Sequence, residues 1–183
     1  QVNPVPAVAF TFSNTCAQSP TQFTDLSVSP QGNISQWLWN FGDGQTSTQQ
    51  NPVHTYATGG SYIVSLTVTN TQGCSHTSEQ TVHIFNPPTA GFAYNSVYCP
   101  AGQVSFQDLT VGNGSPVTWR NWDFGNGNFS TTANPVYVYP LVDSCYNVTL
   151  TVGNASGCTD TTSQVVCVKP AFGFTFDADA SCT

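Results

Sequence analysis

The chain has 183 residues and a net charge of −7, with Arg120 and Lys169 as its only basic residues against nine carboxylates. Nucleic acids and anionic membranes are bound through clustered Lys and Arg, so this balance excludes both as partners. Aromatic residues make up 13% of the chain, which argues against disorder, and no apolar run is long enough to span a membrane.

Short β-strands separated by turns are predicted along the chain, without helical periodicity. The strongest strand signal is at residues 62–69, where β-branched residues alternate with others. Glycines predict turns at residues 42–44 and 59–60. In the first half, strands are expected at 7–12, 22–26, 34–41, 46–49, 53–56, 62–69 and 75–85. Short strands in this number predict an all-β, immunoglobulin-like sandwich.

The second half of the chain repeats the first at an offset of 83 residues, which becomes 84 after one inserted residue. Cys16 recurs as Cys99 and again as Cys182, and Trp39 recurs as Trp122. Self-similarity with a fixed period indicates repeated modules. The expected boundaries are 1–86 for one sandwich, 87–169 for a second and 170–183 for the first strand of a third. We therefore expect the natural protein to be longer.

Cys145 and Cys167 occur only in the second copy and lie symmetrically about Ser156. In a hairpin centred there, the two cysteines face each other, which suits a disulfide. The other cysteines leave two arrangements open. Closure within copies joins Cys16 to Cys74 and Cys99 to Cys158, whereas closure between copies joins Cys16 to Cys158. Repeat logic favours the first arrangement, and the topology of a sandwich favours the second. Recurring cysteines also indicate an oxidising, extracellular compartment.

The aromatic residues of the third expected strand separate into two kinds. Trp39 and Trp122 recur and are predicted to lie in the core. Trp37 and Trp119 are candidate exposed contacts. Trp37 has the same parity as Trp39 and can extend the core, whereas Trp119 has the opposite parity from Trp122 and is expected at the surface. An exposed tryptophan can stack on a sugar ring, or it can pack at an edge or against another domain.

The sequence lacks a catalytic constellation, since its histidines do not recur and it has no GxSxG or HExxH motif. Those histidines are His54, His76 and His83. We therefore expect no enzymatic activity. The one cofactor that the sequence offers is Ca²⁺, for which Asp25, Asn40 and Asp43 are candidate oxygen ligands. Asn126 replaces Asp43 in the second copy, so the copies would not share this site equally.

Three motifs recur in the same order in both copies. In the first copy they are WLWNFGDG at 37–44, NPVHTY at 51–56 and GSYIVSLTV at 60–68. In the second copy they are WDFGNG at 122–127, NPVYVY at 134–139 and YNVTLTV at 146–152. The motifs strongly resemble those of the PKD (polycystic kidney disease) domain family over essentially the whole chain. The resemblance implies two tandem immunoglobulin-like β-sandwiches. Departures from the family pattern are Asn40, Asn126 and Tyr137.

The family resemblance also implies what such modules do. They space, extend or display, in long surface proteins and as accessory modules of secreted enzymes. The cysteine placement resembles that of large repeat proteins in gliding bacteria. We therefore expect a non-enzymatic, extracellular structural or adhesive module of a long cell-surface adhesin, stalk or filament. Its partners would be neighbouring repeats, other copies of itself or surface glycans. The alternative is a carbohydrate-binding or spacer accessory module of a secreted hydrolase.

The last residues of the chain predict one more strand. Phe172, Phe174 and Phe176 alternate with smaller residues, so this strand has one strongly apolar face. Such a face is buried either by the rest of its own repeat or by a neighbouring chain, in which case the segment is an assembly strand.

Overall fold

The computed structural model describes residues 4–96, 102–140 and 144–168. The chain divides into two compact parts, Gln1–Asn86 and Pro87–Thr183, called unit 1 and unit 2 below. None of the described residues is helical, and the described sheets each draw their strands from a single unit. The predicted all-β architecture is therefore confirmed.

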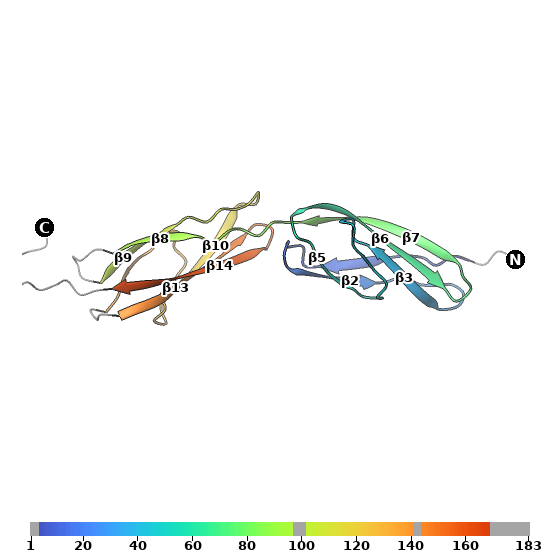
Figure 1. Cartoon of the computed structure of the whole chain (residues 1–183), viewed down its shortest axis with the longest axis horizontal. Helices are drawn as coiled ribbons and strands as arrows, with labels where there is room; N and C mark the ends of the chain where they lie inside the picture. The colour runs from blue at the N-terminus through green and yellow to red at the C-terminus, as the bar shows by residue number, and fades with distance from the viewer. Residues whose placement is uncertain (1–3, 97–101, 141–143, 169–183) are drawn as a thin grey trace, which may run out of the picture. The chain divides into compact units, whose positions relative to one another are not determined.

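Unit 1 is a sandwich of two antiparallel sheets (Figure 1). Its strands are β1 (Phe10–Ser13), β2 (Pro20–Asp25), β3 (Ile34–Asn40), β4 (Thr46–Ser47), β5 (Val53–Thr55), β6 (Gly60–Asn70) and β7 (Ser75–Ile84). The smaller sheet has the order β1-β2-β5, and the larger sheet has the order β4-β3-β6-β7. Strands β6 and β7 form a long hairpin that pairs from Gly60 with Ile84 to Thr69 with Ser75.

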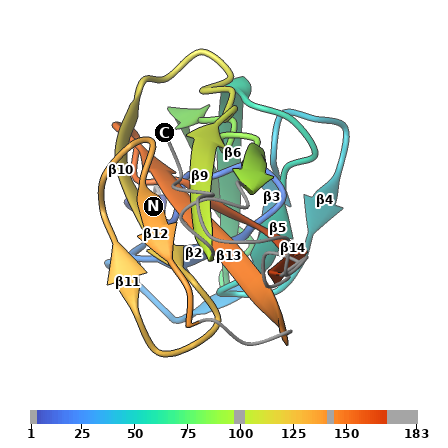
Figure 2. The same ribbon diagram turned by 90° about the vertical axis from the view of Figure 1, so that its left-hand side faces the viewer.

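Unit 2 has the same architecture. Its strands are β8 (Phe92–Ser96), β9 (Gln103–Asp108), β10 (Val117–Asp123), β11 (Phe129–Ser130), β12 (Val136–Val138), β13 (Ser144–Asn154) and β14 (Thr159–Val168). Its smaller sheet has the order β12-β9-β8, and its larger sheet has the order β11-β10-β13-β14. The larger sheet is coloured from yellow to red in Figure 2 and carries the candidate site.

Each unit encloses its own aromatic core. In unit 1, Trp39 is fully buried and its ring contacts Phe10 and Phe23 at centroid distances of 5.1 and 5.5 Å. The indole N–H donates to the carbonyl of Gln49 at 2.9 Å, so the one polar group of this side chain is satisfied. Trp122 lies equivalently in unit 2 and donates to Thr132 O at 3.0 Å. The predicted core positions of both tryptophans are confirmed.

The turn after the third strand of each unit requires glycine. Gly42 and Gly125 have φ angles of 81° and 76°, a region that other residues rarely adopt. A Cβ at either position would lie 2.6 Å from a backbone oxygen, that of Ile63 or Asn147. The turn can therefore approach the long central strand closely only because a side chain is absent.

Candidate functional site: the outer face of unit 2

The solvent side of the larger sheet of unit 2 is called the outer face here. Since Trp122, Leu150 and Val152 point into the core, the residues that alternate with them point outward. Opposed residues of antiparallel strands share a face. By this rule and the observed register, the outer face carries Trp119, Asn121 and Asp123 from β10, Phe129 from β11, Cys145, Asn147, Thr149, Thr151 and Gly153 from β13, and Thr159, Thr161, Ser163, Val165 and Cys167 from β14.

Trp119 lies flat across the outer face over Gly153. The two residues are opposed in the pairing of β10 with β13, and Trp119 is 44% exposed. A Cβ built on Gly153 would fall 2.2 Å from Nε1, 2.3 Å from Cε2 and 2.7 Å from Cζ2 of the indole. An atom in the ring plane beside this edge, at the same distances from Nε1 and Cε2, would lie nearer to Cζ2 than 2.7 Å, so the Cβ lies above the ring plane, over the edge of the ring. One face of the indole therefore covers β13, and the other is open.

Gly153 supplies space and no unusual backbone conformation. It sits within β13 in ordinary strand geometry, where glycine weakens a strand unless another group approaches closely. Its Cα is covered by the indole, and Gly153 itself is buried. Any larger residue would lift Trp119 from the sheet.

Hydroxyl groups line the face beside the indole. Thr149 and Ser163 share a hydrogen bond of 2.8 Å, and Thr161 donates to Thr151 at 3.1 Å. These cross-strand pairs fix the directions of the hydroxyls, which leaves further donor and acceptor positions toward solvent.

A second aromatic side chain lies on the same face. Phe129 is 62% exposed and is opposed to Asp123 in the pairing of β11 with β10. Asp123 is four residues along β10 from Trp119. At about 3.3 Å per residue, Trp119 and Phe129 are separated by roughly 13 Å along the strand direction. Asn121 lies between them.

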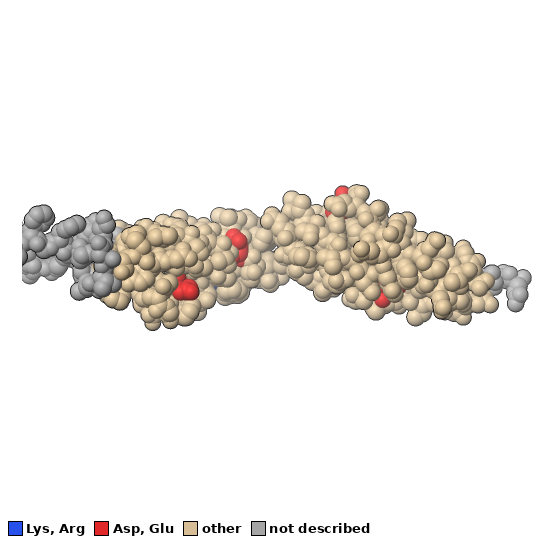
Figure 3. All heavy atoms as spheres, turned by 60° about the horizontal axis from the view of Figure 1, so that its bottom comes forward, with Lys and Arg blue, Asp and Glu red and all other residues tan. Residues whose placement is uncertain are grey.

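The outer face is nearly uncharged. Among its described residues only Asp123 carries charge, and its Oδ1 accepts a hydrogen bond of 2.8 Å from the turn amide of Gly125. Arg120 belongs to the opposite side of β10, where its Nε donates to Asp108 Oδ2. On the side of the molecule drawn in Figure 3, no Lys or Arg is visible and Asp and Glu are sparse.

The buried ion pair of unit 2 shifts the acidity of its carboxyl group. Burial by itself raises the pKa of Asp108, but hydrogen bonds with Thr110 and Arg120 and the positive charge of Arg120 outweigh it. The pKa of Asp108 is therefore lowered below its ordinary value of 3.8. Arg120 is occupied by this pair and does not contribute to the outer face.

Among the residues that the structure describes, the corresponding face of unit 1 carries no aromatic platform. Gln36 and Thr46 occupy the places of Trp119 and Phe129, and Thr69 occupies that of Gly153. A pocket of about 480 Å³ lies at this position. It is lined by Ser35, Gln36, Trp37, Leu38, Thr48, Thr67 and Thr69. The two units thus share a backbone but present different surfaces at equivalent places.

Trp37, the other candidate contact, is not an exposed platform. It is half-buried against the core of unit 1, and its Nε1 donates to Asp25 Oδ2 at 2.6 Å. Trp37, which has the same parity as Trp39, therefore extends the core, whereas Trp119, which has the opposite parity from Trp122, lies at the surface.

The structure does not bring the candidate calcium ligands together. Asp25 accepts from the backbone of Ser27 and from Trp37. Asn40 accepts from Gly42 N, and Asp43 accepts from Gln45 N. Each oxygen is committed to a local turn or a separate partner, which is the usual role of Asp and Asn at strand ends.

The distances along β2 confirm that separation. Asp43 Oδ2 is 2.7 Å from His54 Nε2, and His54 is opposed to Thr21 on β2. Asp25 is four residues further along that strand, or roughly 13 Å. The calcium site expected from Asp25, Asn40 and Asp43 is therefore wrong. Among the described residues no group of three or more His, Cys, Asp or Glu could hold a metal ion.

His54 also has a structural explanation. It is only 6% exposed and stacks on Phe41 at a centroid distance of 4.1 Å and an interplanar angle of 5°. Its Nε2 is bonded to Asp43. A ring enclosed in this way cannot reach a substrate in solution. His76 and His83 are both exposed on β7, and His83 bonds Ser61 at 2.9 Å.

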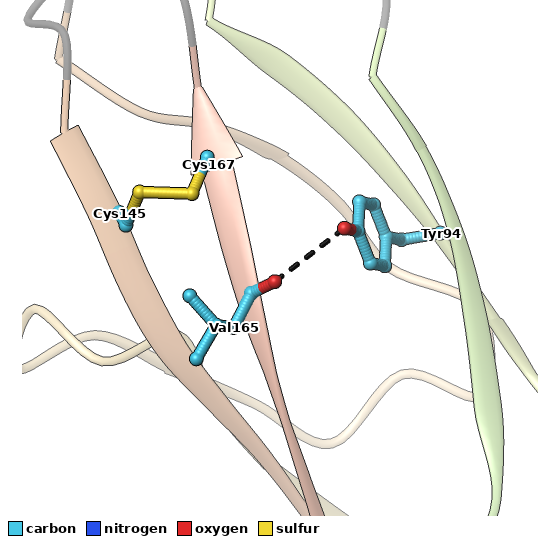
Figure 4. The surroundings of a disulfide bond; sticks show 4 residues. All are labelled: Tyr94, Cys145, Val165 and Cys167. Carbon is cyan, nitrogen blue, oxygen red and sulfur yellow. Dashed lines mark hydrogen bonds between the residues drawn. A yellow bond between two sulfur atoms is a disulfide. The ribbon is translucent and has the colours of Figure 1, made fainter.

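The predicted disulfide between Cys145 and Cys167 is present (Figure 4). The two residues are opposed on β13 and β14, with Cα atoms 3.9 Å apart. Near this bond, the hydroxyl of Tyr94 on β8 donates to Val165 O at 3.4 Å, which links the two sheets of unit 2. The disulfide closes the end of the β13–β14 hairpin that lies away from its turn.

Closure of unit 1 by Cys16 and Cys74 is wrong. The backbone of Cys16 forms an isolated parallel β-bridge with Phe85, just beyond the end of β7. Cys74 precedes the start of β7, where its N–H donates to Asn70 Oδ1 at 2.9 Å. The strand between them, Ser75–Ile84, spans roughly 30 Å, and a disulfide needs Cα atoms within about 7 Å.

The remaining cysteines are only partly described. Cys16 and Cys158 are both disulfide-bonded. Their pairing with each other, the alternative derived from the sequence, stays a prediction. Cys99 and the assembly strand with Phe172, Phe174 and Phe176 lie outside the described residues.

Fold and site together define an immunoglobulin-like module whose most distinctive surface is an aromatic face. A model of the PKD domain family matches residues 1–85 and again residues 86–168. The chain therefore belongs to the PKD domain family, as a tandem of two domains.

Named relatives with similar sequences are proteases. The chain is 46% identical over 67 residues to a microbial collagenase of Vibrio alginolyticus, a match that covers 37% of this chain and 8% of the collagenase. It is 32% identical over 117 residues to the pre-pro-metalloprotease PrtV of Vibrio cholerae, covering 63% of this chain and 13% of PrtV. The chain thus spans only a small part of the length of these relatives.

Solved structures of single PKD domains are also similar. The PKD1 domain of Vibrio anguillarum Epp is 29% identical, with a TM-score of 0.45, and the match covers 47% of this chain and 100% of that domain. The PKD1 domain of Vibrio cholerae PrtV is 36% identical, with a TM-score of 0.43, over 45% of this chain and 99% of that domain.

Among the described residues, no helix has the length and hydropathy to cross a membrane.

Proposed function

We propose that this chain is a non-catalytic accessory module of a secreted, extracellular hydrolase. The observation that carries the proposal is the similarity of its PKD domains to segments of a collagenase and a metalloprotease. Each match covers a small fraction of the relative, so the module accompanies a much larger enzyme there. The enclosure of His54 against Phe41 agrees with a role outside catalysis.

The structural or adhesive rod expected from the repeat has less support. Recurrence of the module is its main argument, but paired accessory domains recur as well. The resemblance to repeat proteins of gliding bacteria gains nothing from the relatives named above, which are proteases. The accessory role is therefore the better-supported function.

The test uses the natural polypeptide that contains this chain. We expect it to include a hydrolase domain, and we expect removal of residues 1–168 to lower turnover of an insoluble polymeric substrate. Turnover of a small soluble substrate should be unchanged, because the module takes no part in bond cleavage. A polypeptide made of further PKD repeats without a hydrolase domain would refute the proposal. So would equal loss of activity on both substrates.

A further inference from the structure

We propose that the outer face of unit 2 binds a neutral polysaccharide, which lies along β10 and stacks on Trp119. Its biological role rests on the proposed accessory function, because a bound polymer would hold the attached enzyme near its substrate. Binding itself follows from the surface alone. Residues of four elements contribute: the flat indole on β10, Phe129 on β11, the space at Gly153 on β13 and the hydroxyls shared with β14.

The indole is presented in the way that sugar stacking needs. One side of the ring is supported by β13 at Gly153, so the side chain has little freedom to move. The opposite side is open, at 44% exposure. A large rigid apolar surface with an N–H at its edge matches the C–H face and the hydroxyls of a pyranose. Support from below means that little side-chain entropy is lost on binding.

Trp119 and Gly153 occur together in one copy and are absent together from the other. Unit 1 has Gln36 and Thr69 at these places, opposed in the same register on the same sheet. Packing of the sandwich does not require the tryptophan, since unit 1 folds the same way without it. The pair is therefore a local adaptation of the surface of unit 2.

The surrounding chemistry favours a neutral ligand. The described outer face has no Lys or Arg that could bind sulfate, phosphate or uronate groups, and Arg120 is held by Asp108. Ordered hydroxyls of Thr149, Thr151 and their partners offer both donors and acceptors. Neutral sugars present the same groups.

A polypeptide fits this face less well. Extended peptides commonly add to an open sheet edge, and helical peptides need an apolar groove. β10 and β13 are interior strands of their sheet, so their backbone groups are already paired. Apart from Trp119, Phe129 and the exposed Val165, the described outer face is polar.

The spacing of the aromatic residues indicates a polymer rather than a single sugar. Trp119 and Phe129 are roughly 13 Å apart along the strand direction, with Asn121 between them. One ring cannot reach both side chains, whereas an extended glycan can contact both and present hydroxyls to the amide.

Affinity electrophoresis of the purified chain tests the proposal. Native gels contain hydroxyethyl cellulose, glucomannan or laminarin as neutral probes, with alginate as an anionic probe and gelatin as a polypeptide probe. We expect retardation by at least one neutral polysaccharide and by neither alginate nor gelatin. Retardation by none of the neutral probes, or by gelatin or alginate alone, would overturn the proposal.

Variants locate the binding surface. Trp119→Ala should weaken binding by about tenfold or more. Gly153→Ala should also weaken it, because the new methyl displaces an indole that is still present. Phe129→Ala should weaken binding to the polymer less. Gln36→Ala, at the equivalent place in unit 1, is the matched control and should bind like the parent. Unchanged binding by both Trp119→Ala and Gly153→Ala would refute the site.

Two readouts keep folding and function apart. Trp119→Phe retains a smaller ring and should bind with intermediate affinity, while thermal melts identify any variant that fails to fold. Failure of sugar binding with a continued need for the module on insoluble substrate would reject this site alone. Sugar binding without any effect on the natural enzyme would reject the accessory role alone.

Discussion

Units 1 and 2 place the same carboxylate in the same position but give it different partners. Asp25 accepts a hydrogen bond from the indole of Trp37, whereas Asp108 pairs with the guanidinium of Arg120. In both units the Asp also accepts from a backbone N–H two residues later, at 2.9 Å. The local turn fixes the carboxylate, and the third strand supplies any donor long enough to reach it.

A second exchange shows the same principle. His54 and Tyr137 both stack on the phenylalanine of the preceding turn, at centroid distances of 4.1 and 4.2 Å. His54 bonds to Asp43, whereas the hydroxyl of Tyr137 accepts from Asn126 at 2.9 Å. Ring stacking is therefore retained while an ionisable pair is replaced by a neutral one.

These differences teach which parts of the module are constrained. Inward positions keep shape and volume, because close packing penalises any change. Polar positions keep a hydrogen bond, but the residue types that form it change from one copy to the other. The outer face keeps the hydroxyl pair Thr67–Thr77 as Thr151–Thr161 but exchanges Gln36 for Trp119, and it is where the two copies can differ in function.

The largest effect is expected in the shared core. Trp39→Ala and Trp122→Ala should each cost about 3–5 kcal/mol, since both remove a fully buried indole. Each variant should lower the melting temperature of its own unit and leave that of the other unit nearly unchanged, as measured by calorimetry. If the loss in free energy of unfolding for one variant is less than about half of the loss for the other, the two cores are not energetically equivalent.

The next effect belongs to unit 2 alone. Cys145→Ser with Cys167→Ser removes a bridge with a sequence separation of 22 residues, which should cost about 2–4 kcal/mol. Targeted substitution is preferable to a reducing agent, because Cys16 and Cys158 are also disulfide-bonded. Unit 1 is the internal control. If the melting temperature of unit 2 is the same in the parent and in the double variant, the bridge does not stabilise the hairpin.

The ion pair of unit 2 should give a pH-dependent effect. The pKa of Asp108 is lowered on folding, so its contribution is complete above its ordinary value of 3.8 and is lost as the pH falls through the folded value. Arg120→Met should destabilise unit 2 by about 1–3 kcal/mol at neutral pH, since it strands a mostly buried carboxylate.

The difference between parent and Arg120→Met should shrink below about pH 4, because a protonated Asp108 no longer attracts Arg120. Melts from pH 7 to pH 2 measure it, and Arg120→Lys is the control that keeps the positive charge. A difference that stays constant over this range would mean that Arg120 acts through packing rather than charge.

Much of this architecture could be predicted from the sequence. Alternation placed the third, sixth and seventh strands within two residues of Ile34–Asn40, Gly60–Asn70 and Ser75–Ile84. Parity within a strand distinguished Trp119 from Trp122, and symmetry about Ser156 paired Cys145 with Cys167. These signals are local, so they hold without knowledge of how the sheets pack.

Contacts between distant segments could not be predicted in the same way. The bond between Asp43 and His54 joins a turn to a strand of the opposite sheet, and the calcium hypothesis failed because it ignored such partners. The space that Gly153 leaves for the indole of Trp119 had a sequence signal that was missed. Gly153 stands inside a strongly patterned strand where the first copy has Thr69, and a glycine there indicates a close approach.

The smallest effect is expected when the stacked pair of unit 1 is replaced by that of unit 2. His54→Tyr combined with Asp43→Asn should change the free energy of unfolding by less than about 1 kcal/mol, because Tyr137 and Asn126 already fit the same backbone. His54→Ala should cost about 2–3 kcal/mol instead, since it removes the ring on Phe41 and leaves Asp43 without that partner. Denaturant unfolding of the three proteins measures both values. A double variant as unstable as His54→Ala would show that the pair is fixed by its surroundings in unit 1, and the two units would then be less interchangeable than their shared stacking indicates.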